Sequence, residues 1–446
     1  MGNTQRIYTG RERDRSTAPV KKSTTRQSTG AKSAPKKSAG AAGTARRTND
    51  KNMRYAQRKE RRRKRIRARM RKQYLLSALL LIVSLTVVVA ANGIKKDTDF
   101  SPTENRMLAQ KPEMSWEEMK DGSFMSDYES YVSDQFIGRD WWISLKLFSD
   151  RLLGKKESNG VYLGQEQYLM EVLSTPDEVN VERNLEAIRN FRQKHSDLNF
   201  FFAMIPNAAY ILTDYMPKDA PVRDQAEDMR EIKENLGEGI VFLDVTDTLR
   251  AHQADGIYYK TDHHWTSRGA YEAFAAMSDA LLIENPATEY EIYPVTDQFS
   301  GTLASKSGYR KATDTIEIYV PVGVTNDYVV YYPDEQKKTA SLYDRASLDQ
   351  KDQYEVFFGG NHALVDITTT CTEDRCLLLF KDSYANSFVQ FLTPYFREIV
   401  MVDPRYYYED IEKIISSKGV TDVLFLYNAN TFLEDNSLAD VLGSES

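Results

Sequence analysis

From residue 180 onward, short apolar runs alternate with amphipathic segments. The runs predict buried strands at Asn199–Ile205, Ile240–Leu243, Cys376–Phe380, Glu398–Val402 and Val423–Tyr427. Between the runs, apolar residues recur at helical spacing, as at Ala270, Phe274, Met277 and Leu281. Continuous apolar strands that alternate with amphipathic helices are typical of a parallel sheet covered on both faces. The pattern therefore predicts an α/β domain.

Two segments depart from this alternation. Residues 286–370 carry short runs rich in Tyr, Val and Thr, separated by polar turns, which predict a β-rich insertion whose tyrosines either pack or stack on sugar rings. Residues 105–155 predict helices that pack on the main domain, with Ser115 as an N-terminal cap. The residues expected to be buried there are Trp141, Trp142, Ile143, Leu145, Leu147, Leu152 and Leu153.

The longest apolar run, Tyr74–Ala91, contains no charge, proline or glycine. As a helix it spans about 27 Å, close to the thickness of a bilayer's hydrocarbon core. A buried core helix would show a polar stripe, and a cleaved signal peptide would have a much shorter basic lead. We therefore expect one uncleaved transmembrane helix over residues 73–93.

Charge differs sharply on the two sides of this helix. Residues 1–72 carry 25 Lys and Arg against 4 Asp and Glu, a net charge of +21, whereas residues 94–446 carry 34 against 61, a net charge of −27. The positive-inside rule then predicts a cytoplasmic N-terminus and an extracytoplasmic C-terminal domain in a cell membrane.

The tail of residues 1–72 is expected to be mostly disordered over residues 1–50, because too few aliphatic residues offset the entropy of ordering. The basic segment at its end, residues 51–72, is expected to lie against the anionic lipid headgroups of the membrane. It shows no regular interleaving of aromatic residues with the basic ones, so it does not favour binding to nucleic acid.

The other predicted boundaries are a stem over residues 94–104, an extracytoplasmic domain over 105–435 and a C-terminal tail over 436–446.

Cys371 and Cys376 lie in the external part, where an oxidising compartment would let them form a disulfide. Two cysteines alone cannot make a structural zinc site.

Candidate chemistry lies in two places far apart in the chain. Ser383 follows the strand that ends at Phe380 and precedes a helix, whose N–H groups could stabilise an oxyanion, although a serine there is also an ordinary cap. A serine attacks an ester only when a neutral imidazole takes its proton, and a carboxylate best holds that imidazole. Asp262 and His264 can supply both groups, so we predict a Ser383–His264–Asp262 triad, with His263 pointing elsewhere.

The Asp262-His263-His264 cluster also raises the alternative of a metal site. Adjacent histidines rarely bind one ion together, and the remaining His195, His252 and His362 show no metal-ligand spacing. We therefore expect no metal and no cofactor.

The motif from Thr261 to Thr266, Thr-Asp-His-His-Trp-Thr, together with Lys381-Asp382-Ser383-Tyr384-Ala385-Asn386-Ser387, resembles the DHHW family of membrane-anchored proteins. These are relatives of the alginate O-acetylation proteins with an SGNH-hydrolase-like fold. The resemblance covers about residues 105–435 and includes residues 104–106, 134–136 with Arg139, 159–161 and 301–304.

This resemblance implies a triad in the chain order Asp262, His264, Ser383 and O-acetyl transfer to an exported polysaccharide or another glycan of a bacterial cell envelope. It also implies an MBOAT-type membrane acyltransferase as a partner that supplies acetyl groups. The candidates for the oxyanion site are Asn386, Asn361, Gly360 and Asn207. Hydrolases of this fold usually have Gly-Asp before the serine, where this chain has Lys-Asp. Two alternatives stay open: a non-catalytic glycan-binding scaffold and a carbohydrate acetyl esterase.

Overall fold

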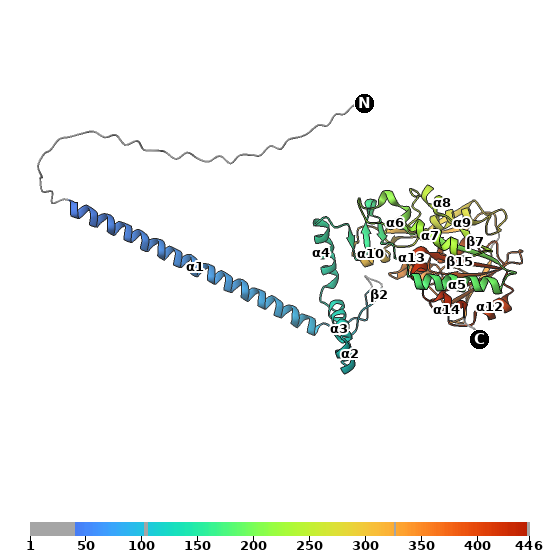
Figure 1. Cartoon of the computed structure of the whole chain (residues 1–446), viewed down its shortest axis with the longest axis horizontal. Coiled ribbons are helices and arrows are strands. Elements are labelled where there is room, and N and C mark those ends of the chain that lie inside the picture. The colour runs from blue at the N-terminus through green and yellow to red at the C-terminus, as the bar shows by residue number, and fades with distance from the viewer. Residues whose placement is uncertain (1–40, 102–105, 325–326, 444–446) are drawn as a thin grey trace, which may run out of the picture. The chain divides into compact units, whose positions relative to one another are not determined.

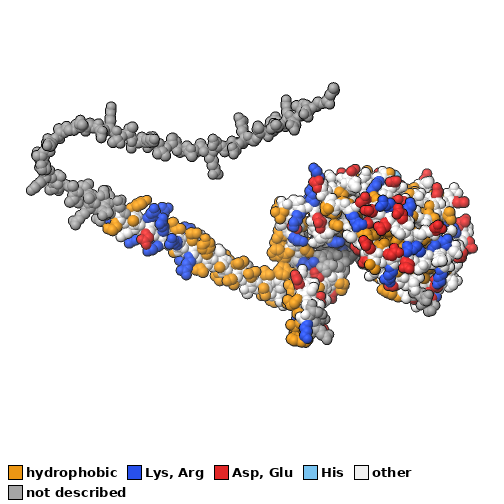
Figure 2. Space-filling model, in the orientation of Figure 1, with side chains coloured by type: hydrophobic (Ala, Val, Ile, Leu, Met, Phe, Trp, Pro, Cys, Tyr) orange, Lys and Arg blue, Asp and Glu red, His pale blue; other side chains and the backbone are white. Residues whose placement is uncertain are grey.

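The computed structural model describes all residues except 1–40, 102–105, 325–326 and 444–446, and the chain forms two units that meet at Val87 and Val88. The first unit holds most of α1 (Ala41–Ile94), a helix of 54 residues. From Met53 to Ile94 this helix is long and apolar enough to be a candidate membrane span. Figure 2 shows basic side chains along one part of α1 and hydrophobic side chains along the next. Residues 41–50, expected to be disordered, are helical, as are residues 51–72 of the predicted tail, and its residues 1–40 lie outside the described residues.

The second unit is built on an eight-stranded sheet. In spatial order its strands are β11 (Lys337–Thr339), β10 (Tyr328–Tyr332), β12 (Leu364–Thr369), β14 (Glu398–Val402), β13 (Cys376–Lys381), β15 (Asp422–Asn428), β6 (Asn199–Ile205) and β7 (Ile240–Leu243). The five strands from β14 to β7 are parallel, whereas β12, β10 and β11 pair antiparallel. The five parallel strands are those that the apolar runs predict.

Side chains of the five parallel strands alternate between two cores, one on each face of the sheet. In β13, Leu377 and Leu379 lie in one core, while Leu378 and Phe380 lie in the other. The first face is covered by α6 (Ala208–Ile211), α8 (Thr246–Ala251), α9 (Ser267–Met277) and α11 (Tyr384–Phe388). The second is covered by α5 (Glu178–Lys194), α7 (Gln225–Asn235), α12 (Ile411–Lys418), α13 (Ala429–Glu434) and α14 (Leu438–Leu442). The predicted α/β fold with helices on both faces is confirmed (Figure 1).

Two predicted boundaries look different in the structure. Within the described part of residues 286–370, β10, β11 and β12 extend the central sheet, and the hairpin of β8 (Tyr290–Phe299) and β9 (Asp314–Pro321) forms a separate sheet. The expected tail of residues 436–446 contains α14, whose Leu438 and Val441 are buried in the core that also holds α5. Both differences concern short elements that are stabilised by partners distant in the sequence.

Between α1 and α5 lie the helices α2 (Trp116–Asp121), α3 (Ser123–Asp134) and α4 (Arg139–Leu152). They follow a short hairpin of β1 (Phe100–Ser101) and β2 (Arg106–Met107). A small sheet of β3 (Glu157–Ser158), β4 (Val161–Leu163) and β5 (Leu169–Glu171) comes next. Leu147 of α4 packs with Val161, Leu169, Leu303 and Tyr309 in a small third core.

Most of the burial expected for α4 is wrong. The predicted buried residues that the structure leaves exposed are Trp141, Trp142, Leu145, Leu152 and Leu153. Leu147 alone of the predicted set is buried, and Ile143 is half-buried. The helix has two apolar faces, and only one of them contacts the domain.

The predicted disulfide is also wrong, because Cys371 and Cys376 are both free. Cys376 is the first residue of β13, where its N–H donates to Oγ1 of Thr421 at 3.0 Å. Its side chain points into the core on the α5 face, and burial raises the pKa of the thiol to about 12. The strand therefore turns the thiol inward, while Cys371 stays in the preceding loop.

Candidate active site

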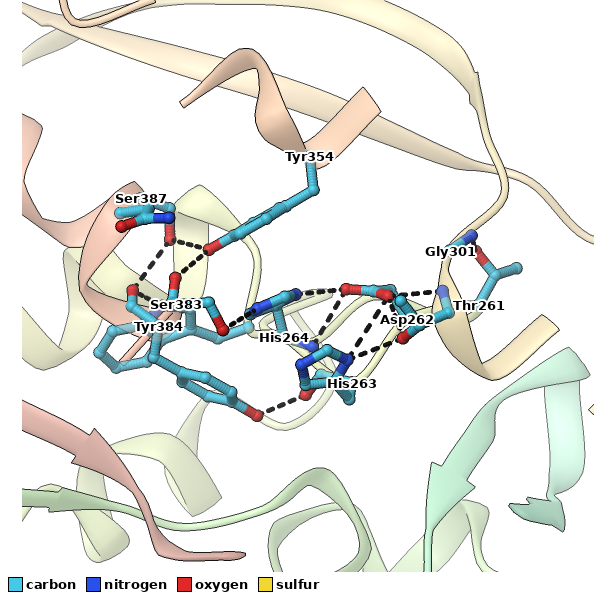
Figure 3. Close-up of polar contacts among 12 residues, drawn as sticks. Thr261, Asp262, His263, His264, Gly301, Tyr354, Ser383, Tyr384 and Ser387 are labelled. Carbon is cyan, nitrogen blue, oxygen red and sulfur yellow. Dashed lines mark hydrogen bonds and ion pairs between the residues drawn. The ribbon is translucent and has the colours of Figure 1, made fainter. Parts of the chain in front are cut away.

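Ser383, Asp262 and His264 meet beyond the carboxyl end of β13, although the serine is far from the other two in the chain (Figure 3). Oγ of Ser383 lies 2.7 Å from Nε2 of His264. Nδ1 of the same imidazole lies 2.5 Å from Oδ2 of Asp262. His264 and Asp262 are buried, and Ser383 is half-buried. The fold thus joins the three predicted side chains in one hydrogen-bonded chain, with the serine at its accessible end.

The start of α10 (Thr302–Ser307) holds the carboxylate of Asp262. The backbone N–H and the hydroxyl of Thr302 each donate to Oδ1 of Asp262 at 2.7 Å. Gly301 allows this approach, because a Cβ on that residue would lie 2.3 Å from Cβ of Asp262. Asp314 supports the preceding residues by accepting from the N–H groups of Lys260 and Thr261, both at 2.8 Å. The Gly301–Thr302 segment noted in the sequence therefore positions the acid.

The surroundings of His264 favour its neutral form. Burial and the neighbouring His263 lower the pKa of His264 to about 4. Burial alone would also lower the pKa of His263, but the charge of Asp262 outweighs it and raises that pKa to about 9. Burial opposes ionisation of Asp262, yet the two imidazoles hold its pKa well below the ordinary value. At neutral pH the site holds a carboxylate, a charged His263 and a neutral His264 that can accept a proton.

His263 does not point elsewhere, as the extended backbone predicted. Its ring centroid lies 3.9 Å from that of His264, and Nδ1 donates to the hydroxyl of Thr302 at 2.7 Å. The possible ligand atoms of Asp262, His263 and His264 lie within 4.8 Å of one another, a spacing at which they could hold a metal ion. However, both oxygens of Asp262 and both ring nitrogens of His264 already take part in hydrogen bonds. An ion would have to displace that hydrogen-bonded chain.

Tyr354 supports both ends of the pair formed by His264 and Ser383. Its ring stacks on the imidazole with centroids 3.8 Å apart and an angle of 10° between the planes. Its hydroxyl donates to the carbonyl of Ser383 at 3.0 Å and lies 3.2 Å from Oγ of Ser387. Sequence reasoning missed this residue, because nothing in its local pattern separates it from the other tyrosines of the predicted insertion.

Lys381 organises two of the oxyanion candidates. This lysine is fully buried at the end of β13, two residues before the serine. Its Nζ donates to Oδ1 of Asn386 at 3.0 Å and to Oδ1 of Asn361 at 3.1 Å, and it lies 3.3 Å from Oδ2 of Asp403. The amide of Asn386 also donates to Oδ1 of Asn361 at 3.2 Å and to the carbonyl of Gly360 at 3.5 Å. These groups bind one another beneath the serine turn.

The fourth candidate, Asn207, links the ends of β6 and β15. Its amide donates to Oδ1 of Asn428 at 3.0 Å and accepts from Nε2 of Gln225 at 2.9 Å. Both halves of this side chain are therefore occupied within the fold. Among the described residues, the backbone N–H of Ser383 has no hydrogen-bond acceptor. Unlike the predicted amides, this N–H is not occupied by another group of the described residues.

A polar cleft of about 620 Å³ adjoins the hydrogen-bonded chain. Its lining includes His263, Thr302, Lys306, Arg405 and Asn430. The guanidinium of Arg405 donates two bonds to Asp403, at 2.8 and 2.6 Å, and its charge contributes to the low pKa of His264. Arg405 comes just after β14, as Ser383 comes just after β13, so the rule that places sites beyond the carboxyl ends of parallel strands could have found it.

Comparisons with known proteins agree with the fold and motifs. Residues 161–359 match a family described as ALGX, an SGNH hydrolase-like domain of acetyltransferase AlgX. The probable alginate O-acetylase AlgJ of Pseudomonas putida is 27% identical over 165 residues, which are 34% of this chain and 41% of that protein. The chain therefore matches less than half the length of this relative.

Two solved structures share the architecture. A DHHW family protein from Eubacterium siraeum is 24% identical with a TM-score of 0.56, covering 64% of this chain and 96% of that chain. PatB1 of Bacillus cereus, solved with a sulfonyl adduct, is 17% identical with a TM-score of 0.51. The match covers 62% of this chain and 98% of that chain. The domain has an SGNH hydrolase-like fold, which it shares with the DHHW family protein, and the predicted relation to the alginate O-acetylation proteins is confirmed.

Proposed function

We propose that this protein is a membrane-anchored, extracytoplasmic O-acetyltransferase that modifies an exported polysaccharide or another cell-envelope glycan. The observation that carries the proposal is the chain of two hydrogen bonds, 2.7 Å from Ser383 to His264 and 2.5 Å from His264 to Asp262. The matching family is described as an acetyltransferase, and the curated relative is named a probable alginate O-acetylase, which supports acetyl transfer over other acyl chemistry.

In the first half-reaction, Ser383 takes the acetyl group from an ester donor. Nε2 of His264 accepts the hydroxyl proton as Oγ bonds to the acetyl carbon, and the carbonyl electrons move to its oxygen. When the carbonyl re-forms, the bond to the donor oxygen breaks, and that oxygen leaves with the proton from His264. The negative charge of Asp262 stabilises the imidazolium between these two transfers.

In the second half-reaction, the acetyl group moves from Ser383 to a sugar. The sugar hydroxyl gives its proton to His264 while its oxygen attacks the acetyl carbon, and Oγ of Ser383 leaves and regains the proton. The sugar thereby becomes an acetyl ester. If water enters instead, the same steps release acetate, so occupation of the polar cleft by the acceptor decides between transfer and hydrolysis.

The unpaired N–H of Ser383 is our proposed donor to the oxyanion of each tetrahedral intermediate. A preorganised donor of this kind stabilises charge that develops only in the transition state. The positive charge of Arg405, on the wall of the adjoining cleft, adds to the favourable field. Asn386 and Asn361 then act indirectly, since their bonds to Lys381 support the turn that carries the serine.

The anchor places this chemistry outside the cytoplasm in the proposal. The candidate span in α1 follows a strongly basic segment, which the positive-inside rule keeps on the cytoplasmic side. Acetyl-CoA is absent on the other side, so the acetyl donor has to be delivered through the membrane. An MBOAT-type acyltransferase is the proposed partner for that step.

Mass spectrometry of the full chain in detergent tests the proposal. After incubation with a small acetyl ester, we expect Ser383 to gain one acetyl group, and we expect none in Ser383→Ala or His264→Ala. The matched control is Ser416→Ala, which removes an exposed hydroxyl from α12 and should acetylate normally. Acetyl transfer to an added oligosaccharide supports the transferase, acetate release without acceptor indicates an esterase, and an unmodified Ser383 would refute both activities.

A further inference from the structure

Helix α4 carries apolar side chains on two opposite faces. Ile143 and Leu147 form the inner face, which packs near Gly308 and in the small third core. The outer face is an apolar stripe, spaced at three and four residues, of Trp141, Leu145, Phe148 and Leu152, with exposed fractions of 60, 37, 60 and 73%. A helix turns once in 3.6 residues, so these four side chains lie in one row. Figure 2 shows hydrophobic side chains gathered along α4.

An apolar groove lies beside this stripe. It has a volume of about 1020 Å³ and lies between α3 and α4. Its apolar lining residues are Met125, Tyr128, Val132, Phe136, Trp142 and Ile143. Trp142 packs edge-on against Trp141, with ring centroids 4.7 Å apart, so the groove and the stripe form one surface. Contiguous exposed apolar surfaces of this kind mark interaction sites.

Hydrogen bonds tie the turn between α3 and α4 to the end of the candidate span. Oδ1 of Asn92, the residue that follows the apolar run, accepts from the N–H of Ile137 at 2.8 Å. Nζ of Lys95 donates to the carbonyl of Gln135 at 3.1 Å. Because the end of a transmembrane helix lies at the bilayer interface, these bonds keep the turn at that level.

We infer that α3 and α4 rest on the outer surface of the lipid bilayer, with the apolar stripe and groove buried among headgroups and upper acyl chains. This inference rests on the membrane anchoring in the proposed function. Tryptophan and tyrosine favour this zone because their rings are apolar and their N–H or O–H groups remain hydrated.

Apolar burial, and not attraction to anionic lipid, drives this contact. The charged residues of α4 nearly balance, with Arg139, Lys146 and Arg151 against Asp140 and Asp150, and α3 carries three acidic residues and no basic one. An interfacial helix with so small a net charge gains little from a negative surface potential. The contact should therefore form on a bilayer of zwitterionic phosphatidylcholine.

The inner face of α4 connects this membrane contact to the catalytic acid. Leu147 packs with Leu303 and Ala304 in the first turn of α10. Thr302, the first residue of α10, donates both bonds to Oδ1 of Asp262. A bilayer contact on the outer face of α4 would therefore set the height and direction of the site relative to the membrane that delivers the acetyl donor.

Quenching of tryptophan fluorescence by brominated lipids tests the inference. The full chain, with Trp116 changed to phenylalanine, is placed in phosphatidylcholine nanodiscs with and without bromine on the acyl chains near the headgroups. Trp141 and Trp142 should lose emission in the brominated discs, whereas Trp265, which is fully buried in the domain, should not. The additional changes Phe148→Ser and Leu152→Ser should weaken the quenching and leave the Trp265 emission intact.

The matched control changes Trp116, Trp141 and Trp142 to phenylalanine and adds Tyr293→Trp on β8. Tyr293 and Trp142 are both 47% exposed, so the two positions differ in place and not in access to solvent. Equal quenching at position 293 and in the stripe would overturn the inference. The inference would also be overturned if the stripe were not quenched and could be crosslinked to a second copy of the chain or to another membrane protein. Failure to enter nanodiscs would instead refute the anchor, and loss of Ser383 acetylation would refute the proposed catalysis alone.

Discussion

Replacing His263 with asparagine tests how the site keeps His264 neutral. The asparagine amide can still donate to the hydroxyl of Thr302, as Nδ1 of His263 does at 2.7 Å. The change removes a positive charge from a ring whose centroid lies 3.9 Å from that of His264. We expect the pKa of His264 to rise, because one of the two main causes that lower it disappears.

The size of the effect follows from the two causes. Lowering the pKa of His264 from 6.5 to about 4 corresponds to about 3 kcal/mol in favour of the neutral imidazole. Burial is the larger cause and remains in the variant, so the new pKa should lie between these two values. Only the neutral form can take the proton of Ser383, so acetylation should be lost on acidification through this pKa, and at a higher pH in the variant than in the unmodified protein.

Nuclear magnetic resonance of the histidine-labelled chain measures this pKa directly. The chain has five histidines, which makes the ring signals of His264 straightforward to assign by substitution. His362→Asn is the control, because His362 contacts the carbonyl of Phe358 and Glu335 and should leave the titration of His264 unchanged. A pKa of His264 near 6.5 in the unmodified protein, or an unchanged value in His263→Asn, would refute the reasoning.

Three further substitutions test the support around the site. Gly301→Ala places a Cβ 2.3 Å from that of Asp262 and should slow acetylation of the serine about 100-fold, as a misplacement of about 1 Å can; an unchanged rate would contradict the close approach. Lys381→Met leaves Asp403 paired with Arg405 but removes the donor to the amide oxygens of Asn361 and Asn386, so it should lower the free energy of unfolding in denaturant by about 1–3 kcal/mol; an unchanged free energy would contradict this role. Tyr354→Phe keeps the stacked ring but loses the hydroxyl, so it should cost about 1–2 kcal/mol in thermal or denaturant unfolding, clearly less than Tyr354→Ala.

Local chemistry explains the predictions that succeeded. β6, β7 and β14 begin and end where the predicted runs do, because the strands of a parallel sheet are mainly apolar. The candidate span could likewise be located from length and composition alone. Ser383, His264 and Asp262 could be proposed together because few other residue types supply a nucleophile, a base and an orienting acid.

Other features depend on contacts between distant parts of the chain. Lys381 stands at the end of an apolar strand, and its burial is tolerable only because Asp403, Asn361 and Asn386 surround its ammonium group. Tyr354 contacts His264 because a short 3-10 helix, Gln353–Val356, places its ring over the imidazole. The local pattern around either residue carries no sign of these partners.

The amino-acid sequence by itself determined the strands, the helix periodicity, the candidate span and the residue types of the site, since each depends on local polarity and intrinsic chemistry. Only the tertiary structure decided which of two apolar faces of α4 packs, that Cys376 turns away from Cys371, and that Ser383 meets His264. The reason is physical: whether a side chain is buried or paired depends on which distant groups folding brings next to it. The neighbours of that residue in the sequence do not specify those groups.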